Sequence, residues 1–271
     1  MKNKLHYFFL IHTLLALDFS LLTYNVHALH PISAGDDPNS RIQSILEESK
    51  DYDFILIQEN WIFSSEYLSS KLPNHSWVVS SESKFSWPIR SLINSNGSGL
   101  SLGILGSHEI INIHEEKFDR CSGWLGKAND CLATKGFQHI QIKIDNEILD
   151  IYNTHLDAGS NSKDREVREY QIKYLVNYIS ENSIGHAVIL AGDLNVNFLT
   201  NEKSILDWLM DELDFKIIDW MNTYDGKPLD YILFRGSESL DIFSDEYGID
   251  NRLNGLSDHP PIKAVFEFKS K

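Results

Sequence analysis

The segment AGDLN, from Ala191 to Asn195, places a carboxylate and an amide two residues apart, directly after the apolar run HAVIL. Side chains of a strand alternate between its two faces, so Asp193 and Asn195 would point the same way at the end of a buried strand. Gly192 permits a bend or a close backbone approach just before them. Asp, Asn and Gly are also the usual turn residues, and the segment by itself is more typical of a turn.

Polar residues of the same kinds recur wherever an apolar run begins or ends. Each has a structural explanation, such as a strand cap, a satisfied core histidine or a proline-anchored loop. Together they are harder to explain this way, because polar groups beside apolar strands are costly unless they are paired or bound to metal. In α/β folds, binding and catalytic residues lie at the ends of the strands. The candidate residues are Asn25, Glu59, His155, Asp193, Asn195, Asp230, Asp258 and His259.

Carboxylate and amide oxygens suit Mg²⁺, which grips substrate phosphates through one or two carboxylates, with Mn²⁺ or Co²⁺ as alternatives. The sequence has no CxxC and no HExxH, which disfavours a thiolate-rich zinc site. It also lacks a Walker A sequence, which argues against a P-loop NTPase. The pattern therefore indicates metal-assisted phosphate chemistry.

The elements that must position these residues are apolar runs bounded by turn residues, with helical patterns between some of them. Helices are predicted over 39–50, with Asn39 or Ser40 as N-cap, over 162–182 and over 201–213. Many strands with a few long helices predict sheets covered by helices. No repeat, linker or low-complexity block divides the chain, so one domain is expected over 18–271. The strand runs are FSLLTYNV, YDFILIQEN, WVVSS, LSLGILG, HIQIKI, ILDIYNTH, HAVILAGDLN, LDYILF and AVFEF.

The 271 residues carry a formal net charge of −15, which disfavours a polyanion such as nucleic acid as the partner. The first 17 residues, two lysines followed by a short apolar run, are typical of a signal peptide, although His6 and His12 interrupt the run and no clean cleavage site follows. We therefore expect a secreted or extracytoplasmic protein, with an uncleaved first strand as the alternative. Cys121 and Cys131 could form a disulfide or remain buried thiols.

Six segments, LLTYNV, IQENW, YNTHLDAG, AGDLN, LDYILF and LSDHPPI, resemble in this order the signature segments of the endonuclease/exonuclease/phosphatase superfamily. They run from Leu21 to Ile262 and so cover nearly the whole chain. The resemblance implies an α/β fold of the DNase I type, a four-layer αββα sandwich in which helices flank two mixed β-sheets. It also implies Mg²⁺-dependent hydrolysis of phosphoesters.

The same resemblance implies a role for each candidate residue. Glu59 with Asn25 would hold the metal, and Asp258 would complete a charged floor. Asp193 and Asn195 would orient the attacking water and the phosphate. His259 would be the general base, fixed by Asp230, and His155 would donate a hydrogen bond or a proton.

The segment DCLATKG resembles one branch of the superfamily, the neutral sphingomyelinases. There an Asp and a Lys, here Asp130 and Lys135, form a switch that positions the active site. The substrate implied is sphingomyelin, a membrane phospholipid, cleaved to ceramide and phosphocholine. Trp61, Trp87 and Trp124 are candidate choline-binding aromatics, each also explained by core packing.

The chain departs from the bacterial sphingomyelinases between LDYILF and the SDH loop, where some of them carry an aromatic-tipped hairpin that enters membranes. This chain has an acidic segment there without an adjacent aromatic pair. Phe243, Tyr247 or the pair Trp124 and Leu125 could take over membrane contact. The alternatives are a DNase-like nuclease, an inositol or other lipid phosphatase, and an inactive binding protein. No oligomer is implied.

Overall fold

A computed structural model of the chain describes residues 17–29, 35–80, 97–123, 130–131, 133–144 and 146–271. Twelve strands within these residues form two six-stranded sheets. The first sheet contains β1 (Leu17–Ala28), β2 (Phe54–Asn60), β3 (His75–Val79), β4 (Ser101–Leu105), β11 (Leu240–Ile249) and β12 (Ile262–Ser270), in the order β11-β12-β1-β2-β4-β3. The second contains β5 (Glu109–Lys117), β6 (Gly136–Ile144), β7 (Glu147–His155), β8 (Ala187–Asp193), β9 (Lys216–Ile217) and β10 (Asp230–Arg235), in the order β5-β6-β7-β8-β10-β9.

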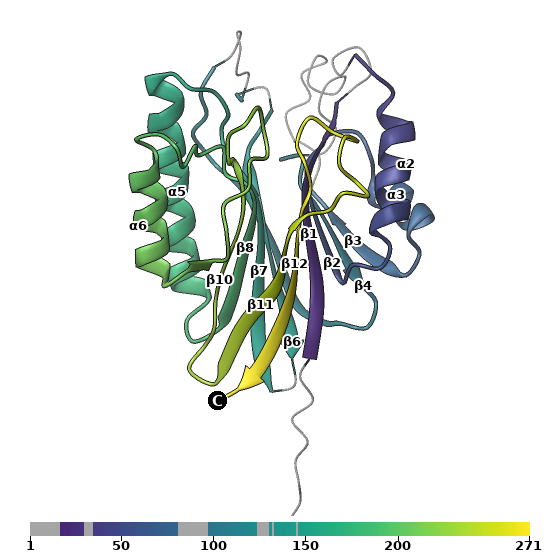
Figure 1. The fold of residues 1–271 in the computed structure, drawn as a ribbon, viewed down its shortest axis with the longest axis vertical. Helices are drawn as coiled ribbons and strands as arrows, with labels where there is room; N and C mark the ends of the chain where they lie inside the picture. The colour runs from purple at the N-terminus through teal and green to yellow at the C-terminus, as the bar shows by residue number, and fades with distance from the viewer. Residues whose placement is uncertain (1–16, 30–34, 81–96, 124–129, 132, 145) are drawn as a thin grey trace, which may run out of the picture.

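Helices cover the outer face of each sheet (Figure 1). The helices α2 (Pro38–Ser49) and α3 (Ser65–Lys71) pack on the first sheet, and α5 (Ser162–Asn182) and α6 (Lys203–Leu213) pack on the second. Both sheets are mixed, since β1 runs parallel to β2 and β7 parallel to β8 while their other neighbours are antiparallel. The predicted four-layer αββα sandwich is confirmed.

Alternating side chains of the central strands build the layers. In β1, Phe19 and Leu21 enter the core between the two sheets, whereas Leu22 and Tyr24 enter the core beneath α2. Both sets are fully buried, as expected for a strand that is covered on both faces. The apolar runs of the sequence are therefore the inner strands of the sandwich.

Strand direction brings the polar strand ends together. The parallel strands β1 and β2 and the parallel strands β7 and β8 all finish at one end of the sandwich, and β10 begins there. The loop that leads from β11 into β12 lies at this end, and the C-terminus lies at the opposite end (Figure 1).

Several elements differ from the sequence prediction. The first helix begins at Pro38 with Asp37 as N-cap, not at Asn39 or Ser40, because the Asp37 side chain accepts a hydrogen bond from the Asn39 amide. The strands β5, β9 and β11 and the helix α3 were not predicted. The acidic segment between LDYILF and the SDH loop contains β11, which pairs with β12 along its full length.

The second predicted helix, over 162–182, is confirmed as α5, and the third begins two residues late as α6. Cys121 and Cys131 form a disulfide with a Cα–Cα distance of 5.1 Å. Residues 1–16 of the predicted signal peptide lie outside the described residues. Among the helices described, none has the length and apolar character that a membrane span requires.

Candidate active site

Strand register aligns four site positions in one row across the second sheet. Gly136 of β6 lies opposite His155 of β7, His155 lies beside Asp193 of β8, and Asp193 lies opposite Asp230 of β10. Neighbouring strands are about 4.8 Å apart, so the side chains of this row can contact one another. The row also places Lys135, the residue before Gly136, next to the site.

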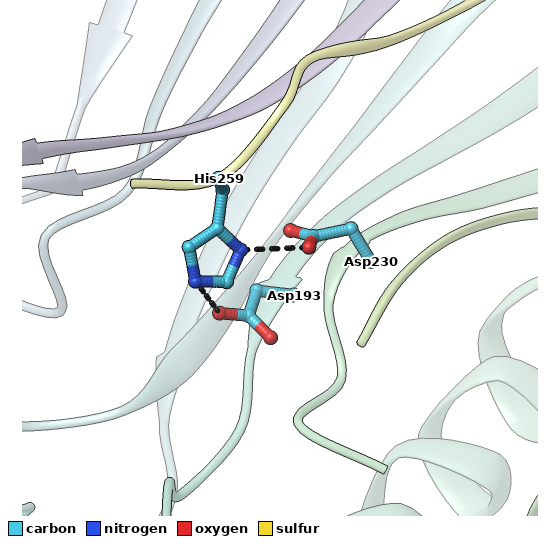
Figure 2. A group of neighbouring side chains, drawn as sticks. All are labelled: Asp193, Asp230 and His259. Atoms are coloured by element: carbon cyan, nitrogen blue, oxygen red, sulfur yellow. Dashed lines mark hydrogen bonds and ion pairs between the residues drawn. The ribbon is translucent and has the colours of Figure 1, made fainter. Parts of the chain in front are cut away.

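His259 joins the row from the loop that precedes β12 (Figure 2). Its Nδ1 lies 2.7 Å from Asp230 Oδ2, and its Nε2 lies 3.9 Å from Asp193 Oδ2. The amide of Asp230 donates to Thr223 Oγ1 at 3.0 Å, which fixes the start of β10. All three charged side chains are buried. A carboxylate that bonds Nδ1 fixes the tautomer and directs Nε2 toward the cleft.

Burial and the neighbouring charges shift the pKa values of Asp193 and His259. Burial raises the pKa of the Asp193 carboxyl, and the charge of Asp230 raises it further. Burial would lower the pKa of His259, but the charge and the hydrogen bond of Asp230 outweigh it and raise the pKa. The pair of Asp193 and His259 therefore retains a proton at neutral pH, unless positive charge is brought to the site.

The first sheet faces this row with Asn25 of β1 and Glu59 of β2. Asn25 Nδ2 donates to Asp193 Oδ2 at 3.1 Å, which links the two sheets. Glu59 has a φ of 60°, a left-handed conformation that is uncommon outside glycine and clusters at functional sites. Its Oε2 lies 3.2 Å from His27 Nδ1, a contact that sequence reasoning missed. The signal for His27 was its position two residues beyond Asn25.

Lys135 and Asp130, the predicted switch pair, lie together directly behind His155. Lys135 Nζ lies 3.4 Å from Asp130 Oδ1 and 2.8 Å from His155 Nε2. Asp130 also accepts from the Ala158 amide at 2.9 Å, and the residue after it is the disulfide-bonded Cys131. Burial and the charge of Lys135 lower the pKa of His155 well below its ordinary value, so this imidazole is neutral.

Two predicted placements are wrong in detail. β8 ends at Asp193, and Asn195 has a φ of 52° while its amide donates to Asp193 Oδ1 at 2.9 Å. The two residues therefore form a turn around the carboxylate, not successive positions on one strand face, because the strand pairing stops before Asn195. Asp258, expected in a charged floor, is 43% exposed and lies at the rim, because it belongs to a loop and not to a strand.

Six of the predicted site residues line a cleft of about 1120 Å³, whereas Asn25, Asp130, Lys135 and Asp230 lie behind its lining; the six are Glu59, His155, Asp193, Asn195, Asp258 and His259. Tyr224 lines it too, with its ring 4.8 Å from that of His259. Of the predicted choline-binding aromatics, Trp61 is buried in the protein and is not part of the lining, and Trp87 and Trp124 lie outside the described residues.

Neither Tyr247 nor Phe243, two of the proposed membrane-contacting residues, lies at the cleft. Tyr247 packs against the core between the sheets. Phe243 is exposed and lies nearer the start of β11, whose other end leads toward the site. Leu125, like Trp124, lies outside the described residues. Where some bacterial sphingomyelinases have a hairpin, β11 is joined to the SDH loop by short turns that include the buried Leu253.

Two sets of donors in the site suit a divalent cation. Asp193, Asp230 and His259 each offer one atom, all within 4.8 Å of one another. Glu59, with Asn25 and Asp258, offers the oxygen ligands that Mg²⁺ prefers. Adjacent ligands of an octahedral Mg²⁺ are about 3 Å apart, and the 2.7 Å between Asp230 and His259 marks a hydrogen bond. The assignment of the metal to Glu59, Asn25 and Asp258 stays a prediction.

The fold and the site define a class: the DNase I-like αββα proteins that act on phosphoesters. Residues 22–216 match the endonuclease/exonuclease/phosphatase family 2, and the chain belongs to this family. The sphingomyelinase of Mycobacterium bovis is 23% identical over 93% of this chain and 53% of its own length, so the chain spans about half of that relative.

Solved structures share the fold. A Staphylococcus aureus beta toxin F277A, P278A mutant, with bound magnesium ions, has 19% identity and a TM-score of 0.66 over 92% of this chain and 99% of the toxin. Sphingomyelinase C from Streptomyces griseocarneus has 15% identity and the same TM-score of 0.66, over 92% of this chain and 99% of its own.

Proposed function

We propose that this protein is a Mg²⁺-dependent phosphodiesterase that hydrolyses sphingomyelin to ceramide and phosphocholine. The observation that carries the proposal is the buried His259–Asp230 pair, which lies 3.9 Å from Asp193 in a cleft shared with Glu59 and His155. The mycobacterial relatives support sphingomyelin as the substrate.

In this mechanism a water molecule attacks phosphorus, its proton passes to Nε2 of His259, and the bond from phosphorus to the ceramide oxygen breaks. The released ceramide oxygen takes its proton from solvent. Asp230 holds the imidazole and stabilises its charged form. The neutral His155 gives a hydrogen bond to the phosphate, not a proton, because the adjacent positive charge resides on Lys135. Asn195 and Asp193 orient the water and the phosphate.

Glu59, Asn25 and Asp258 would hold the cation. Bound there, Mg²⁺ would neutralise charge on the phosphate oxygens and lower the pKa of His259 and Asp193 toward the values that base catalysis needs.

We further propose that residues 18–271 form one catalytic domain and that the protein acts outside the cytoplasm. The core between the sheets supports one domain, since it draws on strands from both halves of the chain. The Cys121–Cys131 disulfide supports the location, because disulfides persist in oxidising compartments.

A nuclease is the second candidate. The cleft is lined by Lys163, Arg165 and Lys227 besides the site residues, and its volume of about 1120 Å³ leaves room for more than one phosphate. Against it stands the net charge of −15, which opposes the approach of DNA.

The test is a pair of hydrolysis assays, on sphingomyelin vesicles and on plasmid DNA, each with Mg²⁺ and with EDTA. Phosphocholine release that requires Mg²⁺ is the expected result. His259→Ala should remain folded and lose about 10²–10⁴-fold in rate. The control is His114→Ala, because His114 on β5 also bonds a carboxylate but does not line the cleft.

If the DNA is nicked and the lipid stays intact, the substrate is DNA and the proposed mechanism still applies. Near wild-type turnover by His259→Ala would remove the role of this residue as base. If neither substrate is hydrolysed, the protein acts on another phosphoester or is a binding protein without activity.

A further inference from the structure

His27 lies in the cleft and has no role in the mechanism above. It occupies the irregular part of β1, where the register with β2 shifts between Asn25 and Ala28. Its φ of 47° is left-handed. Its amide donates to Asn25 Oδ1 at 3.1 Å, and its carbonyl accepts from Arg41 Nη2 at 3.0 Å. The backbone is therefore held from both sides in a conformation that costs energy.

This backbone directs the imidazole toward two of the carboxylates that we assign to the metal. His27 Nδ1 lies 3.2 Å from Glu59 Oε2 and 3.7 Å from Asp258 Oδ2. The side chain is 32% exposed, so it is open to the cleft. One nitrogen thus lies within reach of both acidic groups.

One of these separations is that of neighbouring ligands of one ion. With metal–ligand bonds of about 2.1 Å, adjacent ligands of an octahedral ion are about 3 Å apart. The 3.2 Å between Nδ1 and Glu59 Oε2 matches this separation. The 3.7 Å between Nδ1 and Asp258 Oδ2 exceeds it, so Asp258, which is 43% exposed on its loop, has to move toward the ion.

We propose that His27 Nδ1 is a ligand of the divalent cation, together with Glu59 and Asp258. The proposal rests on the metal dependence of the proposed function. An imidazole nitrogen favours later transition metals, whereas an all-oxygen site favours Mg²⁺. The site therefore binds Co²⁺ more tightly than Mg²⁺, and His27 sets this preference.

A simpler arrangement would use the same contact differently. His27 could orient Glu59 by a hydrogen bond without touching the ion, as outer partners of metal ligands commonly do. In that arrangement the loss of His27 would weaken Mg²⁺ and Co²⁺ binding by equal factors, and the ligand field of Co²⁺ would not change. The two arrangements therefore predict different metal-binding data.

The experiment measures Co²⁺ and Mg²⁺ binding to the full chain by calorimetry and records the visible absorption spectrum of bound Co²⁺. His27→Gln should raise the Kd for Co²⁺ about 10–100-fold, change the Kd for Mg²⁺ less than about threefold, and alter the Co²⁺ spectrum. The matched control is His114→Gln, since His114 Nε2 also lies 3.2 Å from a carboxylate, that of Glu116, away from the cleft. It should change neither affinity.

His27→Cys gives a second readout, one that does not depend on a loss of metal affinity. A thiolate bound to Co²⁺ adds a sulfur-to-metal charge-transfer band, which appears only if position 27 contacts the ion. Circular dichroism verifies that each variant is folded.

Equal losses for both metals, an unchanged spectrum, or a folded His27→Cys protein without the new band would overturn the proposal. A wild-type chain that binds neither metal would overturn it together with metal dependence. Metal binding as expected without lipid or DNA hydrolysis would refute the proposed function alone and leave the assignment of His27 in place.

Discussion

At the scale of single residues, the 2.7 Å contact between Asp230 and His259 has two separable effects. It fixes the direction of Nε2, and its negative charge stabilises the protonated imidazole. Burial opposes the second effect, but Asp230 outweighs it and the pKa of His259 is raised. Removing the charge while keeping the shape of the side chain should therefore change both the rate and its pH dependence.

For Asp230→Asn we expect kcat/KM to fall about 10²–10⁴-fold, because the tautomer and orientation of the base are no longer fixed. The base acts only when deprotonated. Losing the nearby negative charge lowers the pKa of His259, so the acidic limb of the pH–rate profile moves to lower pH. A pH series of kcat/KM measures both changes.

Asp225→Asn is the matched control for this pH series. Asp225 lines the same cleft, but its side chain is 81% exposed, so solvent screens its charge. Its φ of 46° also suits asparagine. An acidic limb that moved to higher pH in Asp230→Asn would contradict the electrostatic role given to Asp230.

At the scale of elements, the site depends on how closely β7 and β8 approach each other. A Cβ at Gly192 would lie 2.0 Å from the carbonyl oxygen of Thr154, and its φ of 141° is also unfavourable for other residues. Gly192 immediately precedes Asp193, so any shift there would displace the central carboxylate of the row.

Gly192→Ala should lower the free energy of unfolding by roughly 3 kcal/mol or more, because the strands must separate to admit the methyl group. Urea denaturation measures the change. Gly248→Ala is the control, because a Cβ at Gly248 in β11 meets nothing within 4 Å and its φ is ordinary. Equal stability of the two variants would show that β7 and β8 part more easily than their spacing indicates.

The inner strands could be predicted from the sequence because both their faces are buried, which leaves long apolar runs such as HAVIL. Of the four edge strands in the two sheets, β3 was predicted, whereas β5, β9 and β11 were not. β5 is exposed or half-buried along its whole length, and charged residues interrupt β11; such side chains are typical of edges that must not pair with other chains. The seven residues of α3 are too few for a clear helical period.

The same reasoning separates the site residues that the sequence predicts from those that it does not. Residues at the ends of central strands, such as Asp193 and His155, could be predicted because strand direction alone brings them together. His27 was missed and Asn195 was misplaced because both adopt left-handed backbone conformations, which a residue pattern does not specify. The exposure of Asp258 follows from the path of a loop, which side-chain periodicity does not specify either.

At the scale of the whole molecule, the net charge of −15 determines how the protein meets a surface. Long-range repulsion from an anionic bilayer acts over roughly 30 Å at 0.01 M salt and only a few ångströms at 1 M. Lys163, Arg165 and Lys227 around the cleft oppose this repulsion locally.

We expect hydrolysis of sphingomyelin in vesicles to slow about 3–10-fold at low salt when phosphatidylserine replaces part of the phosphatidylcholine, because encounter with the bilayer becomes less frequent. Raising the salt concentration should restore most of the rate. Vesicles of sphingomyelin and phosphatidylcholine alone, which carry no net charge, should show little salt dependence and are the control. Faster hydrolysis on the anionic vesicles would mean that the basic side chains around the cleft, and not the net charge, govern the approach to the membrane.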